Sequence, residues 1–155
     1  MRLLSDAAEY ALRAAVWLAE RRSQPHTTQQ IAAGTRASPG YLAKVLQMLA
    51  RAEIVRGQRG VGGGWILDRD PGALTVLDVI NAVDPVERIT RCPLGLAEHG
   101  TELCALHRRV DDAIAHLEHA FASTTIAEIL ADTKRHKPLC SLRISAPSAP
   151  SPRSP

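Results

Sequence analysis

The stretch with the most distinctive chemistry runs from residue 92 to residue 107 and holds two cysteines and two histidines. Cys92 and Cys104 bracket His99, and His107 follows Cys104 closely. Thiolates and imidazoles are ligands that zinc prefers, although this spacing is looser than the close cysteine pairs typical of zinc sites. Where thiols stay reduced, cysteines serve as metal ligands or redox groups rather than as structural disulfides. We therefore expect metal or redox chemistry in this stretch.

The same two cysteines are also compatible with a thiol switch, in which Cys92 and Cys104 oxidise directly. Such a switch requires readily ionised thiols, and Arg91 and Arg108 are the cations close to them in the sequence. Cys140 is the third cysteine of the chain and lies in the C-terminal tail. We expect it to be a bystander.

A second group of side chains suits contact with nucleic acid. Lys44 can donate to guanine and Gln47 can pair with adenine, whereas Ser38 and Tyr41 suit phosphates. Farther along, arginines alternate with glycines that let a backbone approach a phosphate or a minor groove. The predicted DNA-contacting residues are Ser38, Gly40, Tyr41, Lys44, Gln47, Arg56, Arg59 and Gly60. A solvated surface is the simpler alternative for each of them, most of all for Tyr41.

The spacing of apolar residues predicts the elements that present these groups. Residues 39–51 have a helical period, Pro39 suits the first helical position, and Ser38 is expected to cap the helix. Thr27 opens a shorter preceding helix through a capping box. Two short β-type runs, 54–55 and 65–67, enclose the basic glycine-rich segment. Helix, turn, helix and basic hairpin together predict a winged helix-turn-helix.

The other predicted elements frame this unit. Helices are expected over 3–20, 76–83, 103–122 and 125–131, with an irregular loop over 88–104 and a Pro- and Ser-rich disordered tail. The helix over 103–122 has apolar residues at heptad-like spacing, which is adequate for pairing with a second copy. We favour a homodimer, because a lone winged helix reads only a short site. Packing of this helix on its own domain is the alternative.

Charge and composition narrow the classes of function. The 155 residues have a net charge of +3, which is unevenly distributed. The first 67 residues contain nine basic and four acidic residues, a net charge of +5, and the remainder has a net charge of −2. A basic front half suits a protein that meets phosphate with one end. Only 3% of the residues are aromatic, which disfavours stacking on single-stranded bases.

The sequence also argues against a membrane protein and against an enzyme. No apolar run approaches ~18 residues, and the N-terminal segment lacks the pattern of a signal peptide, so we expect a cytoplasmic location. No nucleophile elbow or paired-acid motif is present, and GVGGGW lacks the strand-to-helix context of a dinucleotide site. A winged helix that binds another protein remains an alternative.

Several segments together resemble the Rrf2 family of bacterial winged-helix regulators, which includes the IscR, NsrR and RirA types. They are MRLLSDAAEYALRA, SPGYLAKVLQMLARAEIVRGQRGVGGGW, LTVLDVINAVD, the Cys92 to Cys104 loop and TTIAEIL. The resemblance covers about residues 1 to 132. It implies a homodimeric repressor that binds palindromic double-stranded DNA in a sequence-specific way, and that senses iron–sulfur cluster status, redox state or nitric oxide.

The resemblance also implies a division of the chain. The expected fold is mainly α with a small β-hairpin wing, in which a winged helix-turn-helix domain spans 1–84. A cysteine-containing sensor loop spans 85–103, and a dimerisation helix with a short closing helix spans 104–133. The disordered tail then covers 134–155.

Cluster-binding members of the family carry three cysteines in the sensor loop and a histidine shortly afterwards. Here Glu98 occupies the place of the middle cysteine. Because iron–sulfur clusters also accept histidine, the resemblance implies a [2Fe–2S] cluster with mixed ligands. Arg13 stands where some members have a histidine ligand, and arginine cannot ligate iron. The candidate ligands are Cys92, Cys104 and His107, with Glu98, His99 and Glu9 as less certain ones.

Two further interpretations of the sensor loop stay open beside the cluster. One is a cluster-free regulator that uses a thiol switch or a partner protein as its signal. The other is a site that has lost its sensing function in a protein that still represses.

Overall fold

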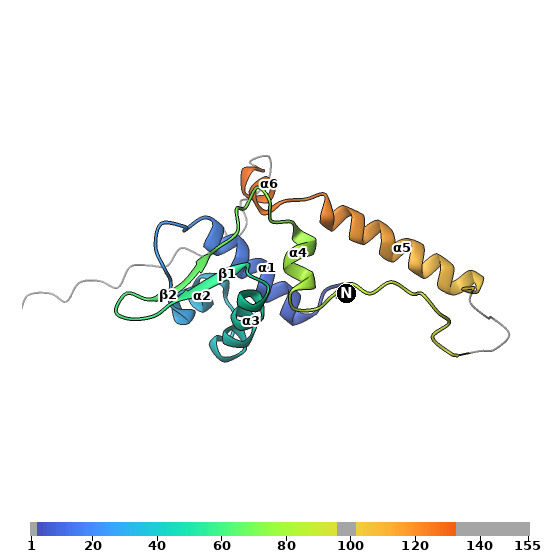
Figure 1. Ribbon diagram of the computed structural model, residues 1–155, viewed down its shortest axis with the longest axis horizontal. Helices are drawn as coiled ribbons and strands as arrows, with labels where there is room; N and C mark the ends of the chain where they lie inside the picture. Colours follow the sequence, from blue (N-terminus) through green and yellow to red (C-terminus); the bar gives the residue numbers. More distant parts are fainter. Residues whose placement is uncertain (1–2, 96–101, 133–155) are drawn as a thin grey trace, which may run out of the picture.

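The computed structural model describes residues 3–95 and 102–132, which form six helices and one antiparallel hairpin (Figure 1). The elements are α1 (Asp6–Ala19), α2 (Thr28–Thr35), α3 (Pro39–Arg51), β1 (Val55–Gln58), β2 (Gly64–Leu67), α4 (Val76–Asn81), α5 (Ala105–Ala122) and α6 (Ile126–Ala131). The predicted fold class, mainly α with a small β-hairpin, is confirmed. The tail over 134–155 lies outside the described residues. Within them, no helix is long and apolar enough to span a membrane.

The α1 helix is central, because small side chains on its buried faces let other helices approach closely. Ala8, Ala11, Ala14 and Ala15 are fully buried, and α1 contacts α2, α3, α4 and α6. The prediction placed the start of this helix at residue 3, which is too early. The Ser5 side chain accepts a hydrogen bond from the Ala8 N–H and so defines the helix start.

The α2 and α3 helices form the predicted helix-turn-helix. The α2 capping box is present, with Thr27 and Gln30 each accepting from the other's backbone N–H. Arg36 makes the turn in the left-handed region, with φ 53°. Ser38 occupies the N-cap position of α3, but the prediction that its side chain caps the helix is wrong. The backbone differs between the two N-cap residues, with ψ 123° at Ser38 and 156° at Thr27, and only the Thr27 side chain accepts a hydrogen bond from its helix.

The hairpin is attached to the helical core at its base. Val55 pairs with Leu67 and both are buried, while Gln58 pairs with Gly64. Trp65 exchanges two backbone hydrogen bonds with His26, at 2.9 and 2.7 Å, so the chain before α2 extends the hairpin. A Cβ atom at position 64 would collide with the His26 backbone, which explains the glycine there. The strands begin one residue later and one earlier than the predicted 54–55 and 65–67 runs.

The α4 and α6 helices close the core beside α1, whereas much of α5 extends from it (Figure 1). Capping boxes begin both α4 and α6, and the two starts are joined by a bridge between Thr75 and Thr125. Ile126 of α6 is fully buried. No residue of α5 is fully buried. Its C-terminal half contributes Leu117 and Phe121 to an apolar hollow shared with Ile80 of α4.

Candidate nucleic-acid interface and cysteine site

The α3 helix presents two opposite faces, as its sequence period predicts. Leu42, Val45, Leu46 and Leu49 are at most 1% exposed and pack into the core. The other face is open, and the structure places five of the predicted DNA-contacting residues on it or at its start. These exposed residues are Ser38, Gly40, Tyr41, Lys44 and Gln47. A straight, solvent-exposed helix face of this kind has the shape that enters a major groove.

The Tyr41 ring is held in place by a neighbour on α1. It meets the Tyr10 ring edge to face, with 5.6 Å between ring centroids and 73° between ring planes. Tyr10 in turn lies under the Arg13 guanidinium at 5.9 Å. No pattern in the sequence indicates this contact between two helices. It orients Tyr41 while leaving the side chain 40% exposed.

The tip of the hairpin is a tight turn that projects a basic and an apolar side chain. Gly63 N–H donates to the Gly60 carbonyl at 3.0 Å, and Gly60 has φ 98°, which favours glycine. Arg59 is exposed and has no hydrogen bond or ion pair with any described residue. Val61, beside it, is fully exposed. The tip is therefore free to meet another molecule.

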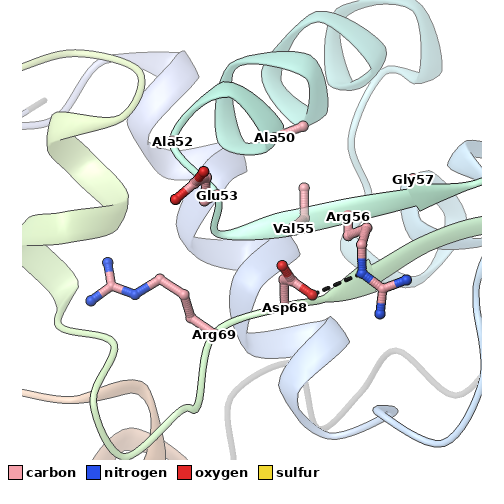
Figure 2. Close-up of a pocket in the computed structure, with 8 residues that line it drawn as sticks. All are labelled: Ala50, Ala52, Glu53, Val55, Arg56, Gly57, Asp68 and Arg69. Atoms are coloured by element: carbon pink, nitrogen blue, oxygen red, sulfur yellow. Dashed lines mark hydrogen bonds and ion pairs between the residues drawn. The ribbon is translucent and has the colours of Figure 1, made fainter.

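Arg56, also predicted to contact DNA, is engaged within the hairpin. Its Nε donates to Asp68 Oδ1 at 2.9 Å, as Figure 2 shows. The pair lies at the rim of an open hollow of about 750 Å³, which Glu53 and Arg69 also line. Charged walls and an open shape do not suit an apolar small molecule. We therefore interpret this hollow as a surface groove beside the wing.

Cys104 and His107 lie together at the start of α5. Cys104 is the N-cap residue, and its Sγ is 3.3 Å from Nδ1 of His107. A sulfur and a nitrogen bound to one tetrahedral metal ion are about 3.6 Å apart, given metal bonds of about 2.3 and 2.1 Å. The two donors are thus close to the separation that a single metal ion would require.

Cys92 comes from the other arm of the loop. Its carbonyl accepts a hydrogen bond from Gly95 N–H at 3.0 Å, so the chain turns immediately after it. Cys92 and Cys104 are both thiols, not a disulfide. Glu98 and His99, two of the less certain ligand candidates, lie outside the described residues. Within residues 3–95 and 102–132, no three His, Cys, Asp or Glu side chains are grouped closely enough to hold a metal ion.

Glu9, the third less certain candidate, has a partner of its own. Arg13 Nε donates to Glu9 Oε1 at 2.9 Å, which confirms the ion pair suggested by their spacing of one helical turn. Arg13 also reaches the Thr35 carbonyl at 3.4 Å, next to the turn of the helix-turn-helix. Glu9 is therefore an ion-pair partner of Arg13 in this chain.

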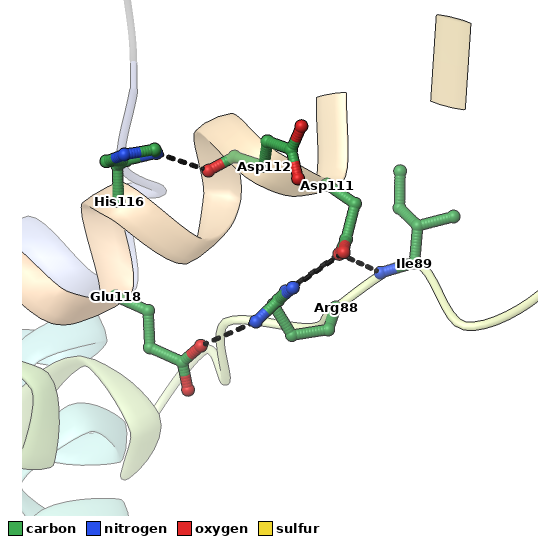
Figure 3. A network of polar contacts seen from close by, with 6 residues as sticks. All are labelled: Arg88, Ile89, Asp111, Asp112, His116 and Glu118. Carbon is green, nitrogen blue, oxygen red and sulfur yellow. Dashed lines mark hydrogen bonds and ion pairs between the residues drawn. The ribbon is translucent and has the colours of Figure 1, made fainter. Parts of the chain in front are cut away.

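One polar network was not signalled by the sequence. Arg88 binds both carboxylate oxygens of Asp111, at 2.7 and 2.6 Å, and the Ile89 N–H donates to the same carboxylate at 2.9 Å (Figure 3). The Arg88 hydrogen bond holds the pKa of Asp111 below its ordinary value, and the same bond raises the pKa of Arg88. Glu118 adds a longer ion pair to Arg88, at 3.7 Å.

Comparison with known proteins identifies the family. The family model of Rrf2, described as an iron-dependent transcriptional regulator, matches residues 4–132. The chain belongs to the Rrf2 family. It is accordingly a transcriptional regulator and not an enzyme, and regulators of this family bind DNA.

Individual Rrf2 relatives and structures agree with this assignment. An HTH-type transcriptional regulator of Aquifex aeolicus is 26% identical over 137 residues, 86% of this chain and 95% of that protein. IscR of Sodalis glossinidius is 32% identical over 95 residues, 61% of this chain and 58% of that protein. The CymR structure, the global cysteine regulator of B. subtilis, matches with a TM-score of 0.65 and 26% identity, covering 83% and 96% of the two chains. T. potens IscR matches in fold, with a TM-score of 0.70 at 23% identity, covering 84% and 88%.

For an Rrf2 regulator, the implied metal group is tested by the donors that the structure brings together. Their chemistry fits, because thiolates and an imidazole ligate both iron–sulfur clusters and zinc. The Cys104 and His107 donors converge at a suitable separation. Completing a site requires Cys92 and at least one more donor.

Proposed function

We propose that this Rrf2 regulator binds palindromic double-stranded DNA as a homodimer and represses transcription in response to a signal received at Cys92, Cys104 and His107. The observation that carries the proposal is the open face of α3 beside the unpaired Arg59 at the hairpin tip. Both project exposed polar or basic groups, and on the α3 face only the Tyr41 ring has a partner within the described part of the fold, Tyr10.

In this proposal, α3 reads bases and the hairpin holds the backbone. Lys44 donates to guanine and Gln47 pairs with adenine in the major groove. Ser38, Gly40 and Tyr41 lie nearer the helix start and approach phosphates, which position the protein without specifying sequence. Arg59 and Gly60 contact phosphate or the minor groove. Arg56 supports the wing through Asp68 and keeps its remaining guanidinium donors for phosphate.

Dimerisation through α5 is supported by an uncovered apolar stripe. Leu106 is 67% exposed and Val110 is 41% exposed, one helical turn apart. The same stripe continues to Leu117 and Phe121, which face the core. A second copy would cover the exposed part, as expected for a pairing helix. The two recognition helices would then read two half-sites of a palindrome.

The signal enters, in this proposal, through the start of α5. A [2Fe–2S] cluster would supply a redox-active and nitric-oxide-reactive centre, held by Cys92, Cys104 and His107, with Glu98 or His99 as a further ligand. Because Cys104 is the N-cap of α5, any change in what its sulfur binds acts directly on the first turn of that helix. The direction of α5 then sets the spacing of the two α3 helices.

A cluster-free thiol switch is the second candidate, and the contact between Cys104 and His107 favours it as well. An imidazole 3.3 Å from the sulfur can accept the thiol proton and leave a nucleophilic thiolate. Oxidation would join Cys92 and Cys104 and remove two protons and two electrons to an external oxidant such as a peroxide.

Two measurements test these proposals. Fluorescence anisotropy with duplex DNA from the region upstream of the chain's own coding sequence tests DNA binding, and no binding tighter than to random duplex would contradict it. An absorption spectrum and iron assay of protein purified without air test the cluster. A colourless, iron-free protein whose DNA affinity responds to thiol oxidation would favour the thiol switch instead.

A further inference from the structure

The segment that leads to Cys92 is fastened to the side of α5 before it reaches the cysteine. Arg88 makes a two-pronged contact with Asp111, and the backbone N–H of Ile89 donates to the same carboxylate. We call these three groups the Arg88 clamp. Ionised, bidentate contacts of this kind are shorter and stronger than neutral hydrogen bonds, and they fix orientation as well as distance. Asp111 is the least exposed member, with 15% of its side chain exposed.

The segment and α5 run in opposite directions. Pro85 and Val86 share a hollow with Leu117 and Phe121 near the end of α5, whereas Ile89 is held at Asp111, nearer its start. Figure 1 shows the same antiparallel course. At Ile89 the segment is therefore heading toward the start of α5, where Cys104 and His107 lie.

The length of chain on each side of the clamp matches. From Ile89 to Cys92, three residues can span at most about 10 Å. From Asp111 back to Cys104, α5 makes about two turns, a rise of about 10 Å. The clamp thus keeps Cys92 within reach of the first turn of α5.

Without the clamp, the nearest upstream anchor on this arm is farther away. It is Val86, whose N–H donates to Asn81 Oδ1 at 2.9 Å. The chain from this anchor to Cys92 would then be six residues long, instead of the three residues that separate Cys92 from Ile89. The released segment would no longer be held along α5, so both the local concentration of Cys92 near Cys104 and its orientation would be lost in part.

We propose that Arg88 and Asp111 are positioning residues of the sensor site, which hold Cys92 level with Cys104 and His107 on the same chain. This inference rests on the proposed function for its biological meaning, because it concerns the same cysteines. The positioning element would lie outside the loop itself, in a pair of charges 23 residues apart.

The test measures how readily the two sulfurs meet. In full-length protein carrying Cys140→Ser, reduced Cys92 and Cys104 are treated with diamide, which accepts two electrons and two protons as the disulfide forms. The reaction is stopped with N-ethylmaleimide and followed by mass spectrometry. Asp111→Asn removes the charge that Arg88 binds. Asp112→Asn, one residue along the same helix and outside the clamp, is the matched control.

We expect Asp111→Asn to slow formation of the intrachain disulfide severalfold, and Asp112→Asn to leave the rate unchanged. Arg88→Lys keeps the positive charge but loses the two-pronged contact, so its rate should lie between those of Asp111→Asn and the parent. If Asp111→Asn does not fold, the rate of Arg88→Lys tests the inference instead. Equal rates in folded Asp111→Asn and the parent would overturn the inference. A disulfide that formed only between chains would overturn it too.

The same samples separate this inference from the proposed function. If the clamp variants slow disulfide formation, but DNA affinity of the parent responds neither to thiol oxidation nor to bound iron, the positioning role stands and the sensor role fails. If DNA affinity responds while the clamp variants behave as the parent does, the sensor role stands and the positioning role fails.

Discussion

Arg13 donates to the carboxylate of Glu9 at 2.9 Å, and this ion pair occupies the one α1 side chain that was a candidate metal ligand. The guanidinium also contacts the Thr35 carbonyl at 3.4 Å, so the pair joins the first helix to the turn before α3. A carboxylate that is already paired with an arginine is a poor metal ligand, because binding the metal would require breaking the ion pair. The exposed setting of the pair makes its contribution to stability small.

The first prediction follows from that pair. Glu9→Gln should leave the iron content of anaerobically purified protein unchanged, because Glu9 is engaged by Arg13. Cys92→Ser is the positive control and should abolish any iron binding. Loss of iron from Glu9→Gln at an unchanged melting temperature would instead assign Glu9 as a ligand.

A second prediction concerns two glycines with opposite surroundings. A Cβ at Gly34 would collide with the buried Trp17 indole, whereas a Cβ at Gly40 would meet open space. Gly34→Ala should therefore lower the free energy of unfolding by about 1–3 kcal/mol. Gly40→Ala should be neutral or stabilising, by up to about 1 kcal/mol, because alanine favours a helix. Urea denaturation measures both values.

The Gly40 variant also tests the proposed interface. If the α3 face approaches DNA closely, Gly40→Ala should weaken DNA binding without any loss of stability. Unchanged affinity would remove Gly40 from the set of proposed contacts.

These cases show what local patterns can and cannot predict. The capping box that begins with Thr27 was found from the sequence, because both partners lie within one helical turn. The collision that fixes Gly34, by contrast, involves Trp17 on another helix, and the Arg56–Asp68 pair spans the hairpin. Such contacts exist only after the chain has folded, so neither spacing nor composition indicates them.

The candidate site also contains features that follow from local sequence and features that depend on the tertiary fold. The exposed face of α3 and the proximity of Cys104 to His107 follow from helical periodicity, and the sequence was sufficient to predict them. The Arg88–Asp111 pair, which we propose positions Cys92, depends on tertiary structure, and Glu9 is already bound by Arg13. A list of residues able to bind a metal does not reveal which of them already has another partner.

A third prediction separates the roles of two basic residues that are proposed to contact DNA. Arg59→Ala should weaken binding to all duplexes alike and reduce the slope of log affinity against log salt by about 1, because a phosphate contact is lost. Lys44→Ala should instead change base preference at one position, by about 1–3 kcal/mol. Titrations at several salt concentrations, with operator and scrambled duplexes, measure both effects. A salt slope that did not move in Arg59→Ala would contradict the wing assignment.

A fourth prediction tests dimerisation through α5. Val110→Glu places a charge on the exposed apolar stripe and should convert the dimer to a monomer, as measured by sedimentation equilibrium. Since Val110 is 41% exposed in the single chain, the helical circular dichroism should be retained. His119→Glu introduces the same side chain on the opposite side of α5 and should leave the dimer intact. A dimer that persists in Val110→Glu would place the interface elsewhere.

The last prediction is a pH dependence of the Arg88 clamp. The Arg88 hydrogen bond, with the Ile89 N–H, lowers the pKa of Asp111 in the folded chain below its ordinary value of 3.8. A carboxyl group whose pKa is lowered by folding stabilises the fold above its ordinary pKa, and this contribution is lost as the pH falls through the lowered value. Melting temperatures of the parent and of Asp111→Asn should therefore differ at pH 6, begin to converge as the pH falls below about 3.8, and meet only below the lowered pKa. The pKa of Glu128 is also lowered, mainly because its carboxylate accepts a hydrogen bond from the Thr125 backbone N–H, so Glu128 should lose its stabilising contribution in acid as well. A Glu128→Gln variant therefore identifies the part of the acid response that belongs to α6. A difference between parent and Asp111→Asn that stayed constant down to pH 2 would show that Asp111 stabilises the chain without its charge.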